Sequence, residues 1–254
     1  MNTIEVTIKD RLALITLNRR RSNSLNREMV IELTDMLTNI DNDSNIGGAL
    51  ITGKENFFSA GLDLIELYSY NEEEAKSFWH LFLNFVARIT AFKKPLICAI
   101  NGHSPAGGCV IALACDARVM AEGKFIIGLN EVPVGIIVPK SIFDLYSFWL
   151  GKANATRSLL EGKLFHPEEA LAIGLVDEVV KQESILTASE RKARKYMAFE
   201  ANTWQQSKLN IRKELIASTS ADQSADLEIM LKQWWSPNTR AILKTIIDSL
   251  QRKN

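Results

Sequence analysis

The segment that decides the fold of this chain spans residues 101–116 and reads NGHSPAGGCVIALACD. The pattern around it predicts a buried strand over residues 96–100 and a short apolar helix over residues 107–114. A turn of small residues, Pro105-Ala106-Gly107, joins the two. The first amides of a helix have no partner within the helix and carry partial positive charge. We therefore expect a free backbone N–H at Gly107 or Gly108, where glycine also lets a ligand approach closely.

A second small-residue turn lies upstream, in the segment FFSAGLD at residues 57–63. It follows a short strand predicted over residues 49–52, and it leaves the amide of Leu62 unpaired at the start of a short helix. Two such amides that converge on one point would hold an oxygen that becomes negative during a reaction. The alternative is that both are ordinary strand-to-helix turns, because small residues before helices are common.

Strands and helices recur on both sides of these turns. Residues 3–9 and 12–17 alternate apolar and polar side chains and predict a hairpin. Helical periodicity follows over residues 26–40 and again over residues 72–92, and two further strands are predicted over residues 118–121 and 125–127. Repeated strand–helix units predict an α/β fold, in which crossovers wind up a sheet with the helices packed outside it.

From Pro139 onward the pattern is nearly all helical, apart from a strand predicted over residues 175–180. Amphipathic helices are expected over residues 183–199, 203–217, 225–235 and 238–250. These helices carry too much apolar area to leave in water, above all Trp204, Trp234 and Trp235. We therefore divide the chain into a core at residues 1–199 and a helical region at residues 200–254. Oligomerisation and a helical cap folded back on the same chain both remain open for that region.

Charge and hydropathy exclude several classes of function. Thirty basic and thirty acidic side chains cancel, and no block of like charge suggests a nucleic-acid partner. No segment approaches the roughly 18 consecutive apolar residues that a membrane span needs. The first residues read as a strand and not as a signal peptide, so we expect a cytoplasmic protein.

The cysteines and histidines indicate neither a disulfide framework nor a metal site. The three cysteines all lie in apolar runs, which predicts buried free thiols: Cys98, Cys109 and Cys115. The three histidines are scattered, so a catalytic Cys/His pair is not expected: His80, His103 and His166. Of these, His103 could approach a ligand at the second turn, but a structural loop histidine is the favoured interpretation.

Glu131 is the carboxylate that suggests chemistry. It lies in the segment IGLNEVPVGII at residues 127–137, where almost all the other side chains are apolar. Acidic side chains rarely enter apolar surroundings unless they are paired or used, and burial raises the pKa toward that of a general base. The alternative is an exposed loop glutamate before Pro133.

Together these segments resemble the crotonase superfamily, the enoyl-CoA hydratase/isomerase family. The resemblance rests on residues 58–64, 101–116, 128–131 and 134–137, and their order and spacing extend it over essentially the whole chain. Within the superfamily, the wording SAGLDL, PAGGC and GLNE is most like that of the mitochondrial-type 3,2-trans-enoyl-CoA isomerases.

The resemblance implies a crotonase-like superhelix of repeated ββα turns, a C-terminal helical oligomerisation region, and homotrimers or dimers of trimers. The implied substrate is an acyl-CoA thioester, so that coenzyme A belongs to the substrate and no separate cofactor or metal is expected. Matched onto this sequence, the oxyanion donors are the amides of Leu62 and Gly107, and the base is Glu131. The implied substrate contacts are Asn130 beside the acyl group and, along coenzyme A, Arg20, Arg21, Ser22 and the Ala60–Leu64 turn, including Leu64. A solvated loop remains the alternative for the arginines.

Val110 marks a departure from the hydratases. They carry two glutamates, and the first of these matches Val110, which cannot handle a proton. One base and an oxyanion hole suffice to move a double bond, so the preferred function is isomerisation of 3-enoyl-CoA to trans-2-enoyl-CoA, as in β-oxidation of unsaturated fatty acids. Two alternatives stay open: a hydratase or other acyl-CoA activity that uses a carboxylate elsewhere, such as Asp63 or Glu66, and a non-catalytic acyl-CoA-binding protein.

Overall fold

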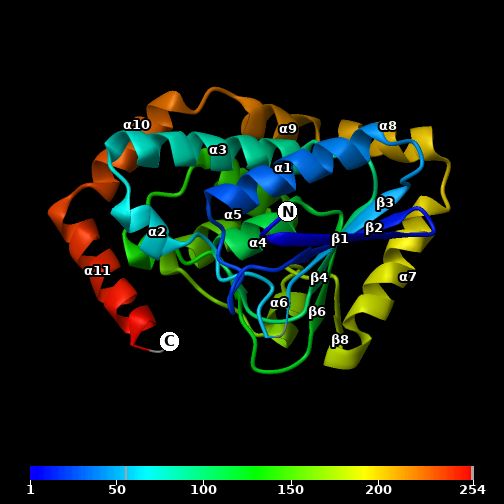
Figure 1. Ribbon diagram of the computed structural model, residues 1–254, viewed down its shortest axis with the longest axis horizontal. Helices are drawn as coiled ribbons and strands as arrows, with labels where there is room; N and C mark the ends of the chain where they lie inside the picture. Colours follow the sequence, from blue (N-terminus) through cyan, green and yellow to red (C-terminus); the bar gives the residue numbers. More distant parts are fainter. Residues whose placement is uncertain (55, 253–254) are drawn as a thin grey trace.

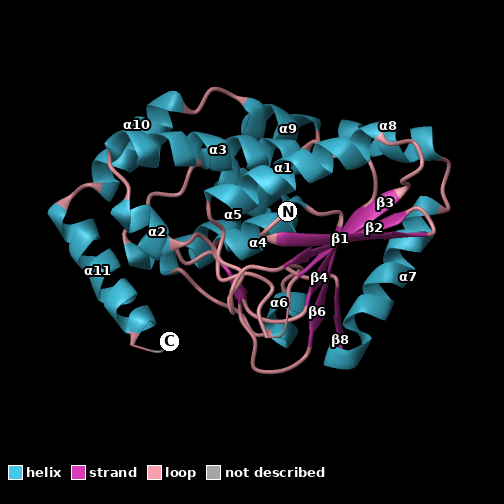
Figure 2. Cartoon of the chain, viewed as in Figure 1, coloured by secondary structure: helices cyan, strands magenta, loops and turns pink. Residues whose placement is uncertain are grey.

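The computed structural model describes residues 1–54 and 56–252, and its main feature is a six-stranded sheet of order β1-β2-β3-β4-β6-β8. Its strands are β1 (Ile4–Lys9), β2 (Leu12–Leu17), β3 (Gly48–Thr52), β4 (Leu96–Ile100), β6 (Ala117–Ala121) and β8 (Glu178–Val180). The first two strands are antiparallel and every later pair is parallel. The predicted hairpin and crossovers are thereby confirmed, and Figure 2 shows the strands gathered on one side of a largely helical molecule.

Helices cover both faces of the sheet, which explains why its central strands are apolar on both sides. Along β4, Leu96, Cys98 and Ile100 join the main core, whereas Ile97 and Ala99 join a second cluster. The main core is covered by α1 (Arg27–Asn42), α3 (Glu72–Thr90) and α4 (Gly107–Ala114), and the second cluster by α7 (Ile185–Met197). Figure 1 shows α7 on one side of the strands and α4, α1 and α3 on the other.

A second, two-stranded sheet joins β5 (Ser104–Pro105) to β7 (Ile127–Gly128) in parallel. The strand predicted over residues 125–127 is therefore wrong in extent. Strand β7 begins only at Ile127, and Phe125 lies outside it with its ring packed against His103, at a centroid distance of 5.3 Å.

The remaining helices connect and surround these sheets. They are α2 (Leu64–Ser69), α5 (Lys140–Glu161), α6 (Pro167–Ala172), α8 (Ala201–Ile211), α9 (Lys213–Ser220), α10 (Ser224–Trp234), α11 (Pro237–Gln251) and the short 3-10 helices Val132–Val134 and Gln182–Ser184. The single helix predicted over residues 203–217 is wrong, because Arg212 separates α8 from α9 with non-helical backbone angles of φ −92° and ψ 5°. The strand predicted over residues 175–180 is shortened to β8.

The C-terminal helices fold back on their own chain. Helix α9 packs against α3 and α5, α10 packs against α3, and α11 packs against α2. Trp234 is buried in this contact, edge-on to Trp79 with ring centroids 6.4 Å apart. A helical cap folded back on the same chain therefore explains the burial of Trp234, while Trp204 and Trp235 stay half-buried. The division at residue 199 and the oligomeric state stay predictions.

None of the helices in the described part of the chain has both the length and the apolar character that a membrane span requires.

Candidate active site

The two small-residue turns lie side by side because they follow the carboxyl ends of neighbouring parallel strands, β3 and β4. Backbone hydrogen bonds then hold the two loops together. The Phe58 amide donates to the His103 carbonyl over 3.0 Å, and the His103 amide donates to the Asn56 carbonyl over 2.9 Å. The two turns are therefore neighbours in space, as the strands before them are.

Glycine is required where the turns meet. Gly61 has a left-handed φ of 86°, and a Cβ atom there would lie 2.9 Å from the Cβ of Ala106. A Cβ atom on Gly107 would lie 3.4 Å from the Leu62 nitrogen. Ala106 itself has a φ of 50°, a costly conformation for a residue with a side chain, and it directly precedes the Gly107 amide. Strained backbone at such a place is typical of a functional site.

The amides of Leu62 and Gly107 are both free. Leu25 hydrogen-bonds to the residues on either side of Leu62. The Leu25 amide donates to the Gly61 carbonyl (2.8 Å), and the Leu25 carbonyl accepts from the Asp63 amide (2.9 Å). Within the described residues, neither the Leu62 nor the Gly107 N–H donates a backbone hydrogen bond, and α4 has no side-chain cap. The structure thus brings the two predicted donors together with their hydrogens available.

The small sheet joins the loop of Glu131 to the turn that precedes Gly107. Strand β7 runs beside β5, and the Ala106 amide donates to the Gly128 carbonyl over 2.8 Å, three residues before Glu131. The loop then turns back, since the Glu131 carbonyl accepts the amides of Val134 (3.1 Å) and Ile136 (3.0 Å). The Oε2 atom of Glu131 is inaccessible to solvent and has no hydrogen-bond partner among the described residues. A solvated loop glutamate is therefore the wrong interpretation of this carboxylate.

Burial raises the pKa of Glu131 from 4.5 to about 7, although the nearby backbone N–H groups of Glu131 and Asn130 act in the opposite direction. A carboxylate with a pKa near neutral can both accept and return a proton at physiological pH. Burial, and not a neighbouring charge, is therefore what raises the pKa of Glu131.

Two further side chains near Glu131 were not among the predicted site residues. Burial and, to a smaller extent, the Glu131 charge raise the pKa of the Cys109 thiol. Tyr146, on α5, is fully buried, and its hydroxyl lies near Ser158 without a well-formed hydrogen bond among the described residues. The spacing of Ile142, Tyr146 and Leu150 indicates a buried helix face, but no sequence pattern relates that face to Glu131.

The other two candidate carboxylates are already engaged. Asp63 caps α2 by accepting the Glu66 amide and forms an ion pair with Arg19 at 2.7 Å. Glu66 lies 3.4 Å from the same guanidinium and accepts the Tyr70 hydroxyl at 2.6 Å. Val110 is 1% exposed and belongs to the apolar core. Of the three carboxylates, Glu131 alone keeps an oxygen without a partner.

Comparison with known proteins identifies the family to which this arrangement belongs. A family model described as enoyl-CoA hydratase/isomerase matches residues 7–241. The chain belongs to the enoyl-CoA hydratase/isomerase family. This confirms the resemblance to the crotonase superfamily and the prediction that the chain is an enzyme of that superfamily.

Individual members of the enoyl-CoA hydratase/isomerase family match most of this chain in sequence and share its fold. The chain is 37% identical over 219 residues to mouse mitochondrial enoyl-CoA delta isomerase 1, covering 85% of this chain and 76% of that relative. It is 30% identical over 200 residues to a short-chain-enoyl-CoA hydratase of Clostridium acetobutylicum, covering 78% and 76%. The crystal structure of human mitochondrial delta3-delta2-enoyl-CoA isomerase superposes with a TM-score of 0.95 at 30% identity, over 99% of each chain. The predicted fold class is thereby confirmed.

The predicted coenzyme A contacts of this family member lie on one loop and one turn. The Ala60 amide donates to the Ser22 carbonyl over 2.9 Å, which joins the Arg20–Ser22 loop to the first turn. Arg20 and Arg21 are exposed, and in the described part of the chain neither forms an ion pair or hydrogen bond through its side chain. Leu64 begins α2 directly after the turn, and Asn130 directly precedes Glu131. The roles of these residues stay predictions.

His103 has a structural environment. Its ring lies between Phe57 and Phe125, at centroid distances of 5.1 and 5.3 Å, and burial lowers its pKa. Its backbone joins the two loops, as described above.

Within residues 1–54 and 56–252, no group of three or more acidic, histidine or cysteine side chains is arranged to hold a metal ion.

Proposed function

We propose that this enzyme isomerises a 3-enoyl-CoA to the trans-2-enoyl-CoA, with Glu131 as its only acid/base. The observation that carries the proposal is the buried, unpartnered Oε2 of Glu131, on a loop that the small sheet joins to the turn of the free Gly107 amide, with Val110 where a hydratase has its other glutamate. The delta isomerases named among the relatives support the same choice.

In the proposed reaction, Glu131 removes a proton from the carbon next to the thioester. The electron pair moves onto the thioester oxygen, which accepts hydrogen bonds from the amides of Leu62 and Gly107. Each such donor is typically worth ~2.7–4 kcal/mol in the transition state. The protonated Glu131 then gives the proton to the carbon two positions farther along, and the double bond comes into conjugation with the thioester. Atoms balance without water or a second carboxylate.

Hydration is the second candidate because hydratases occur among the relatives. Water addition needs one group to deprotonate the water and another to deliver a proton. Val110 can do neither, and Arg19 engages both Asp63 and Glu66. A binding protein without turnover is also disfavoured, because burying a carboxylate without a partner costs free energy and would serve no purpose in a binder.

The same proposal gives the remaining predicted residues their roles. Asn130 lies beside the acyl group, and coenzyme A runs past Arg21, Ser22 and the turn from Ala60 to Leu64. We also propose that the enzyme is a homotrimer or a dimer of trimers. Its cytoplasmic location is an expectation from sequence.

A substrate panel tests the assignment. Purified enzyme is assayed with 3-enoyl-CoA and trans-2-enoyl-CoA thioesters of several chain lengths, and isomerisation and hydration are followed separately. We expect isomerisation to exceed hydration by at least about 100-fold, since one of two required carboxylates is missing. Hydration at a comparable rate would favour the second candidate, and tight binding without turnover of any isomer would favour the third.

Glu131→Gln tests the base itself. Turnover should fall by at least about 10³-fold, within the range that acid/base groups contribute, while acyl-CoA binding stays near that of the wild type. Glu122→Gln, which alters an exposed glutamate, is the control and should keep wild-type kinetics. Retained turnover in Glu131→Gln would overturn the assignment.

A further inference from the structure

Side chains from other helices hydrogen-bond to the carboxyl end of helix α4, whereas its amino end has no side-chain cap. At its amino end the helix has no side-chain cap, and the Gly107 amide is free for the proposed oxyanion. Gly107 and Gly108 also have no side chains through which a neighbour could hold the helix. Backbone contacts from the neighbouring turns meet this end, whereas any side chain that fixes the axial position of α4 acts along its sides or at its other end.

At the carboxyl end, each of the last four carbonyls of α4 has a partner. The Ile111 carbonyl accepts from the Cys115 thiol (3.3 Å) and the Ala112 carbonyl from the Cys115 amide (3.2 Å). The Leu113 carbonyl accepts the indole N–H of Trp149 at 2.7 Å, and the Ala114 carbonyl accepts Arg212 at 2.7 Å. Helix ends ordinarily leave these groups to water or to the next turn.

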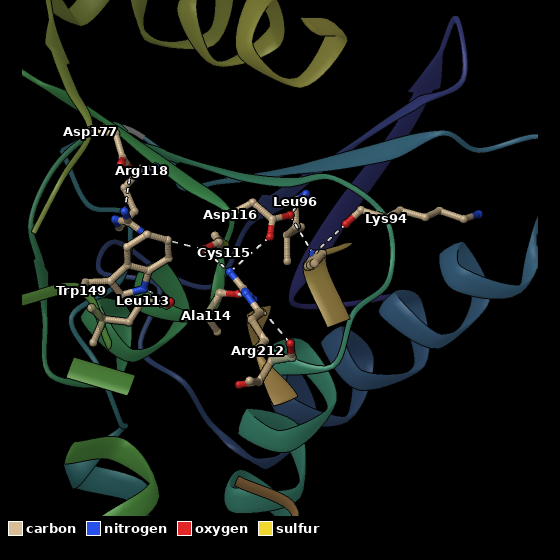
Figure 3. Close-up of polar contacts among 12 residues, drawn as sticks. Lys94, Leu96, Leu113, Ala114, Cys115, Asp116, Arg118, Trp149, Asp177 and Arg212 are labelled. Atoms are coloured by element: carbon tan, nitrogen blue, oxygen red, sulfur yellow. Dashed lines mark hydrogen bonds and ion pairs between the residues drawn. The ribbon is translucent and has the colours of Figure 1, made fainter. Parts of the chain in front are cut away.

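Arg212 is the centre of this arrangement. It is only 4% exposed, and its guanidinium donates to the carbonyls of Ala114 and Cys115 and, at 3.4 Å, to that of Thr90 at the end of α3. It also forms an ion pair with Asp116 at 3.2 Å. Figure 3 shows the guanidinium of Arg212 directed at the segment from Ala114 to Asp116.

Asp116 extends the contact to the sheet. Its carboxylate accepts the backbone amide of Leu96, the first residue of β4, at 2.8 Å, and it forms a second ion pair with buried Lys208 at 2.7 Å. Strand β4 leads into the loop that carries Ala106, so Arg212 ties the carboxyl end of α4 to the same strand from which its amino end departs. Buried cations at a helix carboxyl end also complement its dipole.

We propose that Arg212 is a positioning residue for the oxyanion hole: by fixing the carboxyl end of α4, it fixes the place of the Gly107 amide. The inference rests on the proposed function. An eight-residue helix is about 12 Å long and moves as a rigid rod, so a shift at Ala114 is transmitted to Gly107. A displacement of about 1 Å at a reacting group can cost about 10²-fold in rate.

The test uses Arg212→Gln and Arg212→Lys, with Arg88→Gln as a matched control. Arg88 is also an arginine that donates to a helical carbonyl, that of Leu37 at 2.7 Å, and pairs with an aspartate, Asp41, but its described hydrogen bonds and ion pair are with α1 and not with α4. Two quantities are measured: kcat and KM, and the carbonyl stretching frequency of bound trans-2-enoyl-CoA labelled with ¹³C at the thioester. The frequency reports polarisation by the two amides without any turnover.

For Arg212→Gln we expect kcat to fall by at least about tenfold with KM within about threefold, and the carbonyl frequency to return toward that of free thioester. Arg212→Lys should give intermediate values in both measurements, because its ammonium keeps the charge but reaches fewer carbonyls. Arg88→Gln should keep the wild-type frequency. A wild-type frequency in Arg212→Gln, or an equal loss of kcat in Arg212→Gln and Arg88→Gln, would overturn the positioning role.

Trp149→Phe keeps the proposal testable if Arg212→Gln fails to fold. It removes the hydrogen bond to the Leu113 carbonyl but leaves an aromatic ring for Arg118, which lies 3.7 Å from the Trp149 ring centroid. A smaller shift of the carbonyl frequency in the same direction is expected, and wild-type frequencies in both Trp149→Phe and Arg212→Lys would overturn the proposal. A wild-type enzyme that binds the thioester without any frequency shift would instead overturn the oxyanion hole, and hence the proposed function itself.

Discussion

Gly61 and Gly107 are in direct backbone contact: a Cβ atom placed on Gly61 would lie 3.0 Å from the Gly107 nitrogen. Each residue belongs to the loop after a different strand, β3 or β4, and those strands are hydrogen-bonded neighbours. The separation of the two free amides is therefore set by glycine at the point where the loops touch.

Replacing Gly61 with alanine should damage catalysis more than folding. The added methyl group would push Ala106 and Gly107 away from Leu62, so we expect kcat to fall by about 10²-fold. Gly151→Ala is the matched control, because Gly151 has a similar φ of 71° but nothing within 4 Å of its Cβ position. It should carry the same backbone strain at no cost in kcat. Wild-type kcat in Gly61→Ala would show that the spacing of the amides does not matter.

The rate should depend on a single ionisation near neutral pH. Glu131 must be deprotonated to act as a base, and burial raises its pKa to about 7. We therefore expect kcat/KM to increase with pH through this value and to level off above it, with a slope of one on a logarithmic plot. A profile that stays flat down to pH ~5 would mean that Glu131 is not the base in the free enzyme.

The ionisation of Glu131 should also make the free energy of unfolding depend on pH. The folded-state pKa of Glu131 is raised, so the folded protein retains a proton that the unfolded chain has lost between pH 4.5 and about 7. The contribution of Glu131 to the free energy of unfolding is thus fully present below pH 4.5 and is lost as pH rises through about 7.

Glu131→Gln removes this pH dependence, because the amide cannot ionise and so avoids the cost of a buried negative charge at high pH. At pH ~8 we expect it to be more stable than the wild type by up to about 3 kcal/mol in denaturant unfolding, with the difference shrinking as pH falls. Glu122→Gln should show no such trend, because Glu122 is exposed. Equal pH dependence of wild type and Glu131→Gln would place the Glu131 carboxylate in water.

Arg21 should affect binding and not chemistry. Its exposed guanidinium has no described ion pair, so it can attract the phosphates of coenzyme A only through a screened interaction. We expect Arg21→Gln to raise KM for the acyl-CoA by about 3–10-fold at low salt and by less at high salt, with kcat unchanged. Arg157→Gln, at an exposed position of α5, should leave KM alone. A salt-independent KM in the wild type would exclude this role for the arginine.

Sequence patterns predict the segments of this fold better than their partners. The apolar run over residues 96–100 is recognisable as a buried strand because β-branched and apolar residues continue without a break. The turns at Gly61 and Gly107 are recognisable because small residues interrupt such runs. Their convergence follows from the adjacency of β3 and β4, which the repeated strand–helix pattern suggests but does not specify.

Long-range polar contacts account for what the sequence does not reveal. Arg212 lies within a segment that the sequence pattern predicts as one amphipathic helix, yet its side chain is buried and the helix ends there. Nothing local marks the break, since neither glycine nor proline is present. Arg19 likewise belongs to a run of three arginines beside a turn, but its partners Asp63 and Glu66 lie more than 40 residues away. Periodicity reports how apolar a face is and not which carbonyl or carboxylate it meets.

The contacts of the C-terminal helices bear on the order in which the protein is completed during synthesis. Every strand has been made once Val180 is polymerised, but α4 gains its contact with Arg212 only 32 residues later, at position 212. The loop that carries Glu131 gains its contact with the C-terminal helices later still, because the Gly135 carbonyl at its far end accepts the hydroxyl of Thr239 on α11 over 3.2 Å. A nascent chain therefore has its sheet well before the helices from α8 to α11 hold the carboxyl end of α4 and the loop of Glu131 in place.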